Sequence, residues 1–482
     1  MPDICIHKSL IHLSVFAILP TEVLTVRSLS AVILLLFLTI LSACGNGSGE
    51  DAADAAAFRD AFLAGELAWD DVLARAADEG EVEFFHWGGS EALNAWMESS
   101  ARPAIEAFDI SLNLRRSDTA DAVNLILADD ASGRGLGQGT VDLVWINGEN
   151  FRILRDRGLL FGSFAPRLPN ARYFFLDPDD LRSNVNLFDF GTPTDGAEMP
   201  WAAFQFIFRI DTARIAADEA PVSFAELEGW MRDNPGRFSY VAPPHYIGTT
   251  FVQTLMYEMN PDGTTFEPFL ADPADGDPAE LARLMEPAFD WLRRVEPFVL
   301  GGGGEDGRPG QPIYPATASA LQSRFVSGEV DFDMEFGVYD VDRDIRSGLY
   351  PQTVQNIIFP ETGMITDKSF LAIPSNAPNP AAALVAVNAL SSPESHLSKL
   401  VEIGYAPGLD VPLLDAAMQD RFAAAAPDLR GVRAADLAAR EAPNVNAGLV
   451  DIIDAVWLEY IAERSRRAFA DIVEEAWRSA VE

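Results

Sequence analysis

The sequence predicts an α/β fold arranged as two lobes. Segments with strand character alternate with segments of helical periodicity along most of the chain, and this order is typical of parallel sheets covered by helices. Roughly 440 residues follow the N-terminal leader, which is enough for two or three domains with cores of their own. Two lobes joined by crossing strands fit this order of elements better than one continuous sheet. We expect the chain to cross between the lobes in the apolar strands at residues 201–210 and 368–373.

The N-terminal 43 residues are typical of an export signal. Arg27 precedes an apolar run at residues 29–40 that is short for a membrane span, and residues 1–22 form an extension that an upstream start codon would explain. The following Leu41-Ser-Ala-Cys44 resembles the lipobox of bacterial lipoproteins. We therefore expect an acyl anchor on Cys44 that places the folded part in the periplasm or at the cell surface; a plain N-terminal membrane helix is the alternative.

The composition excludes several classes of protein. The formal charge is −38, from 73 acidic and 35 basic residues, which disfavours binding to nucleic acid or anionic headgroups and is compatible with cationic ligands. Cys5 and Cys44 are the only cysteines, so no disulfide framework is expected. The histidines after the leader, His86, His245 and His396, are far apart in the sequence. The sequence therefore predicts neither a metal site nor a cofactor.

The first half of the mature chain predicts a tether and the first part of lobe I. Residues 44–65 are rich in Gly, Ser, Ala and Asp, which favours a flexible tether. Lobe I is expected to begin at residues 66–200. Its predicted elements, in order, are a helix at 66–80, a strand at 82–87, helices at 92–108 and 120–128, a strand at 141–146 and a helix from 151.

The second half predicts lobe II at residues 201–368 and a return to lobe I with C-terminal helices at 369–482. The predicted elements are strands at 201–210, 238–242, 329–336 and 369–374, and helices at 224–232, 249–258, 316–326 and 380–390. An apolar stripe from Leu449 to Ile461 has helical spacing. It indicates core packing against a lobe that the sequence does not specify, or, as a lesser option, a helix for a partner or a membrane.

Four segments together resemble a known family. They are Trp87-Gly88-Gly89, residues 142–151 (DLVWINGENF), residues 240–251 (YVAPPHYIGTTF) and residues 370–378 (FLAIPSNAP). In this order they are similar to the extracellular solute-binding proteins of ABC importers, in particular the YnjB-like branch, related to thiamine-, polyamine- and iron-binding receptors. The resemblance covers residues 81–396. It implies a monomeric, two-lobed, periplasmic-binding-protein-like fold of type II, which closes on a small molecule and presents it to an ABC permease and its ATPase.

Candidate ligand-binding residues lie where predicted strands meet helices. Ligands of open α/β sheets sit beyond the carboxyl ends of strands, near unsatisfied N–H groups at helix starts. Glycine there lets a ligand approach the backbone, and aromatic rings can stack on planar or cationic ligands. The predicted ligand-binding residues are Trp87, Gly88, Gly89, Asn147, Glu149, Asn150, Trp201, Tyr246, Thr249, Thr250 and Glu335.

Several of these residues have a purely structural alternative. Glu149 could instead place its charge on the first turn of the next helix, and the two asparagines beside it could shape the turn or cap that helix. Thr249 or Thr250 could be an N-cap. Trp145, inside its strand, is expected in the core.

Acidic residues alternate at 331, 333 and 335 on one predicted strand and therefore share a face. We expect Asp331 and Asp333 on a solvated edge and Glu335 near the ligand. His245 is expected at the surface.

Enzyme signatures are missing from the sequence. It contains no Gly-x-Ser-x-Gly motif, and the Gly-rich residues 133–139 precede a strand rather than a helix, unlike a dinucleotide-binding loop. The prediction is therefore a binding protein, with a secreted hydrolase using a carboxylate pair as the alternative. Because the candidate aromatics occur in a strongly acidic chain, the expected cargo is an organic cation or heteroaromatic compound of thiamine or polyamine type.

Overall fold

The computed structural model describes residues 47–481, except for residues 89, 90, 264, 305–309 and 360. The predicted signal peptide, Cys44 and Gly89 lie outside the described residues. Residues Asp54–Glu482 form one compact unit. Within the described part of this chain, no helix has both the length and the apolar character that a membrane span requires.

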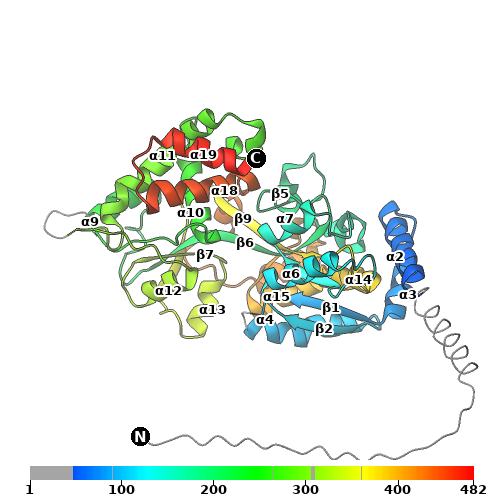
Figure 1. Cartoon of the computed structure of the whole chain (residues 1–482). Coiled ribbons are helices and arrows are strands. Elements are labelled where there is room, and N and C mark those ends of the chain that lie inside the picture. Colours follow the sequence, from blue (N-terminus) through cyan, green and yellow to red (C-terminus); the bar gives the residue numbers. More distant parts are fainter. Residues whose placement is uncertain (1–46, 89–90, 264, 305–309, 360, 482) are drawn as a thin grey trace, which may run out of the picture. The chain divides into compact units, whose positions relative to one another are not determined.

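A mixed sheet runs through this compact unit (Figure 1). Its main order is β10-β6-β9-β3-β1-β2, while β7 and β8 pair with β6, and β11 pairs with β9. The pairs of β1 with β2 and with β3 are parallel, whereas β9 runs antiparallel to β3 and β6. The strands are β1 Glu81–His86, β2 Ser111–Arg116, β3 Leu143–Ile146, β6 Glu198–Asp211, β7 Phe332–Phe336, β8 Val354–Ile357, β9 Met364–Ala372, β10 Ala406–Pro407 and β11 Glu441–Ala442.

Two hydrophobic cores define two lobes. The core of lobe I contains Phe84, Leu143 and Leu371 with the helices α3 Trp69–Glu79, α4 Glu91–Trp96, α5 Arg102–Glu106, α14 Pro380–Leu390 and α15 Pro393–Ile403. The core of lobe II contains Phe208, Phe251 and Trp291 with α9 Phe224–Asp233, α10 Tyr246–Glu258, α11 Pro278–Val295, α12 Ala318–Val326 and α13 Asp340–Arg346. Helices α6 Thr119–Ala131 and α7 Glu149–Asp156 cover the other face of the lobe I strands.

Strands β6 and β9 belong to both lobes. The start of β6 places Trp201 in the core of lobe I, and its end places Phe208 in the core of lobe II. In the opposite direction, β9 begins with Met364 in lobe II and ends near Leu371 in lobe I. The two-lobed α/β architecture predicted from the sequence is confirmed. The residue boundaries drawn from the sequence stay a prediction.

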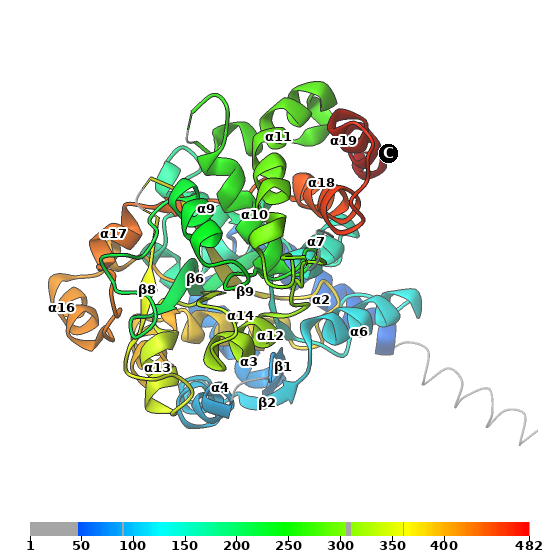
Figure 2. The same ribbon diagram turned by 90° about the vertical axis from the view of Figure 1, so that its left-hand side faces the viewer.

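The C-terminal helices α18 Ala447–Val456 and α19 Phe469–Val481 pack in lobe II. Both contribute buried side chains to its core, among them Ile452 and Ile472, and both contact neighbours in that lobe. Figures 1 and 2 show them beside α10 and α11. The apolar stripe is therefore core packing, and the structure supplies the lobe that the sequence left open.

A helix occupies the segment that the sequence predicts as a flexible tether. Helix α2 spans Gly47–Ala64. Phe58 and Phe62 are buried with ring centres 6.4 Å apart, and Phe62 also lies 6.3 Å from Phe161. Alanine favours helix, and two rings four residues apart share one helix face. The composition alone suggested flexibility, but this aromatic pair gives the helix a surface to bury.

Two buried lysines lie where β6 and β9 pass between the lobes. A bulge in β6 leaves Trp201 outside the β6–β9 ladder, and the Lys399 ammonium donates to its carbonyl and lies 4.1 Å from the centre of its ring. Lys368 donates to the Gly408 carbonyl at 2.7 Å and to the side chain of Asn186. Since buried carbonyls without a partner are costly, these ammonium groups stabilise the irregular backbone at the crossing.

The packing of α2 predicts that this helix is part of the folded domain. Phe62→Ala should lower the free energy of unfolding by about 3 kcal/mol, because it removes a buried aromatic side chain and leaves a cavity. Urea denaturation would measure the change. The exposed Asp60→Ala is the control, with an expected effect below about 0.5 kcal/mol. Equal losses in the two variants would contradict the assignment of α2 to the core.

Candidate ligand-binding site

On lobe I, an exposed tryptophan rests on a column of buried ones. Trp87 follows β1 and is 40% exposed. Its ring meets Trp145 edge-on at 6.2 Å, Trp145 meets Trp201 at 4.7 Å, and Trp201 lies 6.0 Å from Trp96. Aromatic pairs at these separations attract one another. The column therefore supports Trp87 from behind and leaves part of its ring open to solvent.

The buried members of this column do not face solvent. Trp145 is in the core, as the sequence predicts, and Trp201 is fully buried. Trp87 is accessible in this structure, whereas Trp201, the first residue of the segment predicted as lobe II, contributes to the core of lobe I. The sequence shows that residue 201 is aromatic and near a crossing, but the packing of its ring against Trp96 and Trp145 depends on segments far apart in the chain.

The turn between β3 and α7 provides the second part of the lobe I surface. Gly148 has φ +59°, and the ring of Phe190 would be 3.4 Å from any Cβ there, which is a position suited to glycine. Glu149 begins α7 and is exposed, while Asn147 and Asn150 are partly buried. In the following turn of α7, Arg152 forms an ion pair with Asp451 of α18 at 3.0 Å, which joins lobe I to lobe II.

On lobe II, Tyr246 is the first residue of α10. It is 48% exposed, with its ring stacked on His245 at 4.6 Å and 6.1 Å from Phe336. The N-cap is His245, whose Nδ1 accepts from the backbone N–H of Ile247 at 3.3 Å. Tyr246 thus lies at a helix N-terminus, where unsatisfied N–H groups favour polar ligands.

Thr249 and Thr250 lie inside α10 and cap nothing. The helix starts three residues earlier than predicted, so the N-cap alternative for these threonines is wrong. Thr249 is buried and donates from its hydroxyl to Asp454 at 2.6 Å, while Thr250 is fully buried. The sequence signal favoured threonine because it is the commoner capping residue, whereas the backbone after the two prolines makes His245 the cap.

The three alternating acidic residues occupy different surroundings, and the expected solvated edge is wrong. Asp331 is buried with Arg214 at 3.3 Å and with Arg237. Asp333 is buried and accepts from the Tyr350 hydroxyl at 2.8 Å. Arginines from neighbouring elements pair with these carboxylates, and a sequence pattern cannot show such contacts.

Glu335 differs from its two neighbours because no basic side chain of the described residues lies within ion-pair distance. It accepts from the backbone N–H of Phe336 at 2.9 Å. It also lies near enough to Tyr246 to raise the pKa of that hydroxyl, after the larger effect of burial. Burial raises the pKa of Glu335 to about 7. A partly exposed aromatic ring and a carboxylate without an ion-pair partner are therefore neighbours on lobe II.

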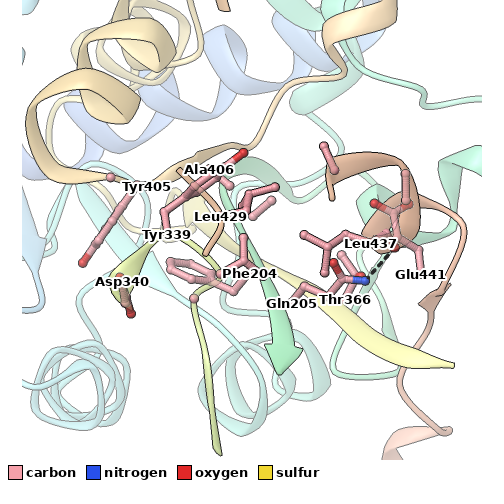
Figure 3. A pocket seen from close by; sticks show the side chains of 16 residues that line it. Phe204, Gln205, Tyr339, Asp340, Thr366, Tyr405, Ala406, Leu429, Leu437 and Glu441 are labelled. Atoms are coloured by element: carbon pink, nitrogen blue, oxygen red, sulfur yellow. Dashed lines mark hydrogen bonds between the residues drawn. The ribbon is translucent and has the colours of Figure 1, made fainter. Parts of the chain in front are cut away.

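A cavity of about 180 Å³ lies where β6, β10 and the turn after β7 meet (Figure 3). Phe204 and Tyr405 line it with ring centres 5.5 Å apart, and Tyr339 and Asp340 come from the turn. On its other side, Gln205 donates to the carbonyl of Leu437 at 3.1 Å. Sequence reasoning missed these residues, although both tyrosines lie within two residues of a glycine.

Metal ligands do not gather in the described part of the chain. There, no group of three or more His, Cys, Asp or Glu side chains is arranged to hold a metal ion. The surfaces around Trp87 and Tyr246 instead offer aromatic faces, a carboxylate and helix N-termini, which are the means of binding an organic molecule.

Two lobes joined by crossing strands, each with an accessible aromatic residue, make up the architecture of this protein. Solved structures share the fold. One is the cyclic alpha-maltosyl-1,6-maltose binding protein from Arthrobacter globiformis, with a TM-score of 0.58 at 15% identity over 83% of this chain and 97% of that one. Another is an ABC transporter substrate-binding protein from Bradyrhizobium japonicum, with a TM-score of 0.51 at 18% identity over 84% and 100%.

Sequence comparison gives the family. Residues 101–426 match the family described as bacterial extracellular solute-binding protein. The protein YnjB of Escherichia coli K12 is 32% identical over 333 residues, which are 69% of this chain and 79% of the relative. The chain belongs to the family of bacterial extracellular solute-binding proteins. Members of this family bind solutes and are not enzymes, so the hydrolase alternative is wrong.

The surroundings of Glu335 predict a pH-dependent stability. Between its ordinary pKa of 4.5 and its raised pKa of about 7, folded Glu335 keeps a proton that the unfolded chain has lost, so the free energy of unfolding falls as pH rises through this window. Glu335→Gln cannot ionise. We expect the variant to match the wild type at pH 4.5 and to exceed it by about 2 kcal/mol at pH 8.

Urea denaturation at the two pH values tests this expectation. The exposed Glu329→Gln, just before β7, is the matched control and should behave like the wild type at both. A difference between Glu335→Gln and the wild type that does not change with pH would show that ionisation of Glu335 is not its cause.

Proposed function

We propose that this receptor is anchored by an acyl chain on Cys44, captures an organic cation between its lobes, and delivers it to an ABC permease and its ATPase. The observation that carries the choice of cargo is the contact between Tyr246 and Glu335. An aromatic face with a neighbouring carboxylate attracts a cation through both the ring quadrupole and the charge. No arginine or lysine of the described chain lies in ion-pair distance of Glu335. Burial raises its pKa to about 7, and a cation bound beside it would favour the ionised form.

The opposite lobe supplies complementary groups. Trp87 presents a partly exposed ring on lobe I, and Glu149 is an exposed carboxylate at the start of α7. Gly88, Gly89, Asn147 and Asn150 are proposed to let the ligand approach the backbone there. Trp201, Thr249 and Thr250 are buried, and we assign them the role of supporting the contact residues.

Closure of the lobes is the proposed signal to the permease. A ligand that contacts Trp87 on one lobe and Tyr246 on the other stabilises the closed arrangement, whereas a ligand held by one lobe alone leaves the equilibrium unchanged. The bending would occur in β6 and β9, since these strands pass from one core to the other. A permease that recognises only the closed form then receives only loaded receptors.

Binding measurements test the cargo and the contact residues. Thermal-shift screening with thiamine, spermidine, neutral sugars and oxyanions should show stabilisation by a cation. For that compound, Trp87→Ala and Tyr246→Ala should each weaken binding about tenfold in calorimetry, as expected for the loss of one aromatic contact. Glu335→Gln should weaken it by a similar factor.

Controls separate a site effect from a general one. Phe108→Ala removes an aromatic ring of similar exposure, 36%, beyond the end of α5, and should leave affinity unchanged. Stabilisation by a neutral sugar with no response to cations would refute the choice of cargo. Unchanged affinity in both Trp87→Ala and Tyr246→Ala would refute the site.

The lipid anchor has an independent test. In cells fed labelled palmitate, the wild type should carry the label and fractionate with membranes, because several acyl chains hold a protein firmly. Cys44→Ser should lose the label, and Cys5→Ser, which changes the other cysteine, should keep it. Label that persists in Cys44→Ser would contradict lipidation at this residue.

A further inference from the structure

Three carboxylates are buried at the hinge without a basic partner. Asp189 lies in the hairpin formed by β4 Phe188–Asp189 and β5 Thr192–Pro193, Glu198 begins β6, and Asp367 lies in the middle of β9. All three are at most 5% exposed. Among the described residues, no side-chain nitrogen of an arginine, lysine or histidine lies within 4 Å of their carboxylate oxygens. Buried acids are normally paired, so this group requires an explanation.

Hydrogen bonds satisfy the three acids only in part. Asp189 accepts from the backbone N–H of Gly148 at 2.8 Å. Asp367 accepts from the backbone N–H of Lys368 at 2.7 Å and from the side-chain amide of Asn444 at 2.7 Å. Neither carboxylate oxygen of Glu198 has a hydrogen-bond partner in the described chain. Mutual repulsion among the three adds to burial in raising the pKa of Glu198.

A cavity of about 140 Å³ lies against this acidic group. Asp367 and Asn444 line it, and the side-chain oxygen of Asn444 accepts no hydrogen bond in the described chain although the residue is only 6% exposed. Phe188 and Phe190 line it from the hairpin. The cavity thus combines a carboxylate with an unpartnered amide oxygen. Both groups are hydrogen-bond acceptors. A cation or a hydrogen-bond donor between them would interact favourably with both.

We propose that this hinge cavity binds an alkali cation such as Na⁺. Hard cations prefer carboxylate and amide oxygens, which Asp367 and Asn444 supply. Burial and the neighbouring Asp189 raise the pKa of Asp367, so a cation bound there would take the place of a proton. A transition metal is a poorer fit, because Asp367 and Asn444 offer neither an imidazole nor a thiolate. Neither Trp87 nor Tyr246 lines this cavity.

The position of this cavity links the cation to hinge movement. Its walls come from the hairpin next to lobe I, from β9, and from Leu270 and Asn446 beside the core of lobe II. Bending of the hinge moves these walls against each other, so the cation has a different affinity for the open and closed forms. By linkage, the ion then shifts the closure equilibrium and the affinity for cargo.

Thermal unfolding of the full chain at pH 8 tests the site without cargo. We compare NaCl with N-methyl-D-glucamine chloride at equal ionic strength, because a chain of charge −38 responds to any salt. The wild type should melt about 2 °C higher in sodium, with a saturable dependence on its concentration. Asp367→Asn should abolish this difference, and Asn444→Ala should move its midpoint to higher sodium concentrations.

Asp142→Asn is the matched control. Asp142 is also fully buried and accepts from the backbone N–H groups of Glu83 and Asn379, but it does not line the cavity, so its variant should keep the sodium gain. Equal melting temperatures of the wild type in the two salts would overturn the proposal. A higher melting temperature of Asp367→Asn in sodium would also overturn it. A melting temperature that responds to pH but not to sodium would do the same, because it would show that the acids bind protons instead.

If Asp367→Asn does not fold, Asn444→Ala decides the question, and an unchanged sodium midpoint in that variant would refute the site. None of these readouts involves the cargo of the receptor. Failure here therefore leaves the proposed transport function untouched, and failure of the cargo screen leaves the sodium site untouched.

Discussion

The shared membership of β6 and β9 in both hydrophobic cores is the constraint on which the rest of the structure depends. Because β6 pairs with β9 in its first half and with β7 and β8 in its second, neither lobe can form its sheet without the strand that also serves the other. The irregularity at Trp201 lies within this shared strand. A buried ammonium from α15 satisfies the displaced carbonyl, which allows a bulge to persist in a core without solvent.

The same crossing organises the ligand surface. The bulge directs Trp201 into lobe I, where it supports Trp145, and Trp145 in turn supports Trp87. On the other lobe, Phe206 of β6 lies 5.8 Å from Phe336, which lies beside Tyr246. Each exposed ring is thus connected through aromatic packing to the same strand. A change of hinge angle therefore carries both rings with it, which is what a receptor that grips its ligand requires.

Charge is distributed unevenly around this strand crossing. Lys368 and Asp367 are neighbours in β9 and so point to opposite faces. Lys368 donates to backbone and amide oxygens on one side, while Asp367 meets Asn444 and the acidic cavity on the other. Only three lysines occur in the chain, and two of them are buried at the crossing. The number of lysines in the sequence does not indicate this role. The role depends on which backbone carbonyls of the folded chain need a hydrogen-bond donor.

The sequence itself determined the fold class, because hydrophobic periodicity reports which face of a strand or helix is buried. Strands β1, β3 and β6 and helices α6, α9 and α14 have the strong apolar patterns that made them predictable. Strand β2 was missed because Asn113, Arg115 and Arg116 interrupt its pattern at the edge of the sheet. The sequence also determined that aromatic and glycine residues occur at the strand ends, Trp87 and Tyr246 among them.

Only the tertiary structure decided which of those residues are accessible and which charges are paired. Trp201 is buried against Trp96 and Trp145, and Thr249 is buried beside Asp454. Arginines pair with the buried Asp331 and Asp333. Each outcome depends on a contact between segments distant in sequence, and a local pattern contains no information about such partners. Glu335 differs from its neighbours for the same reason: the fold brings it a tyrosine where it brings them a guanidinium.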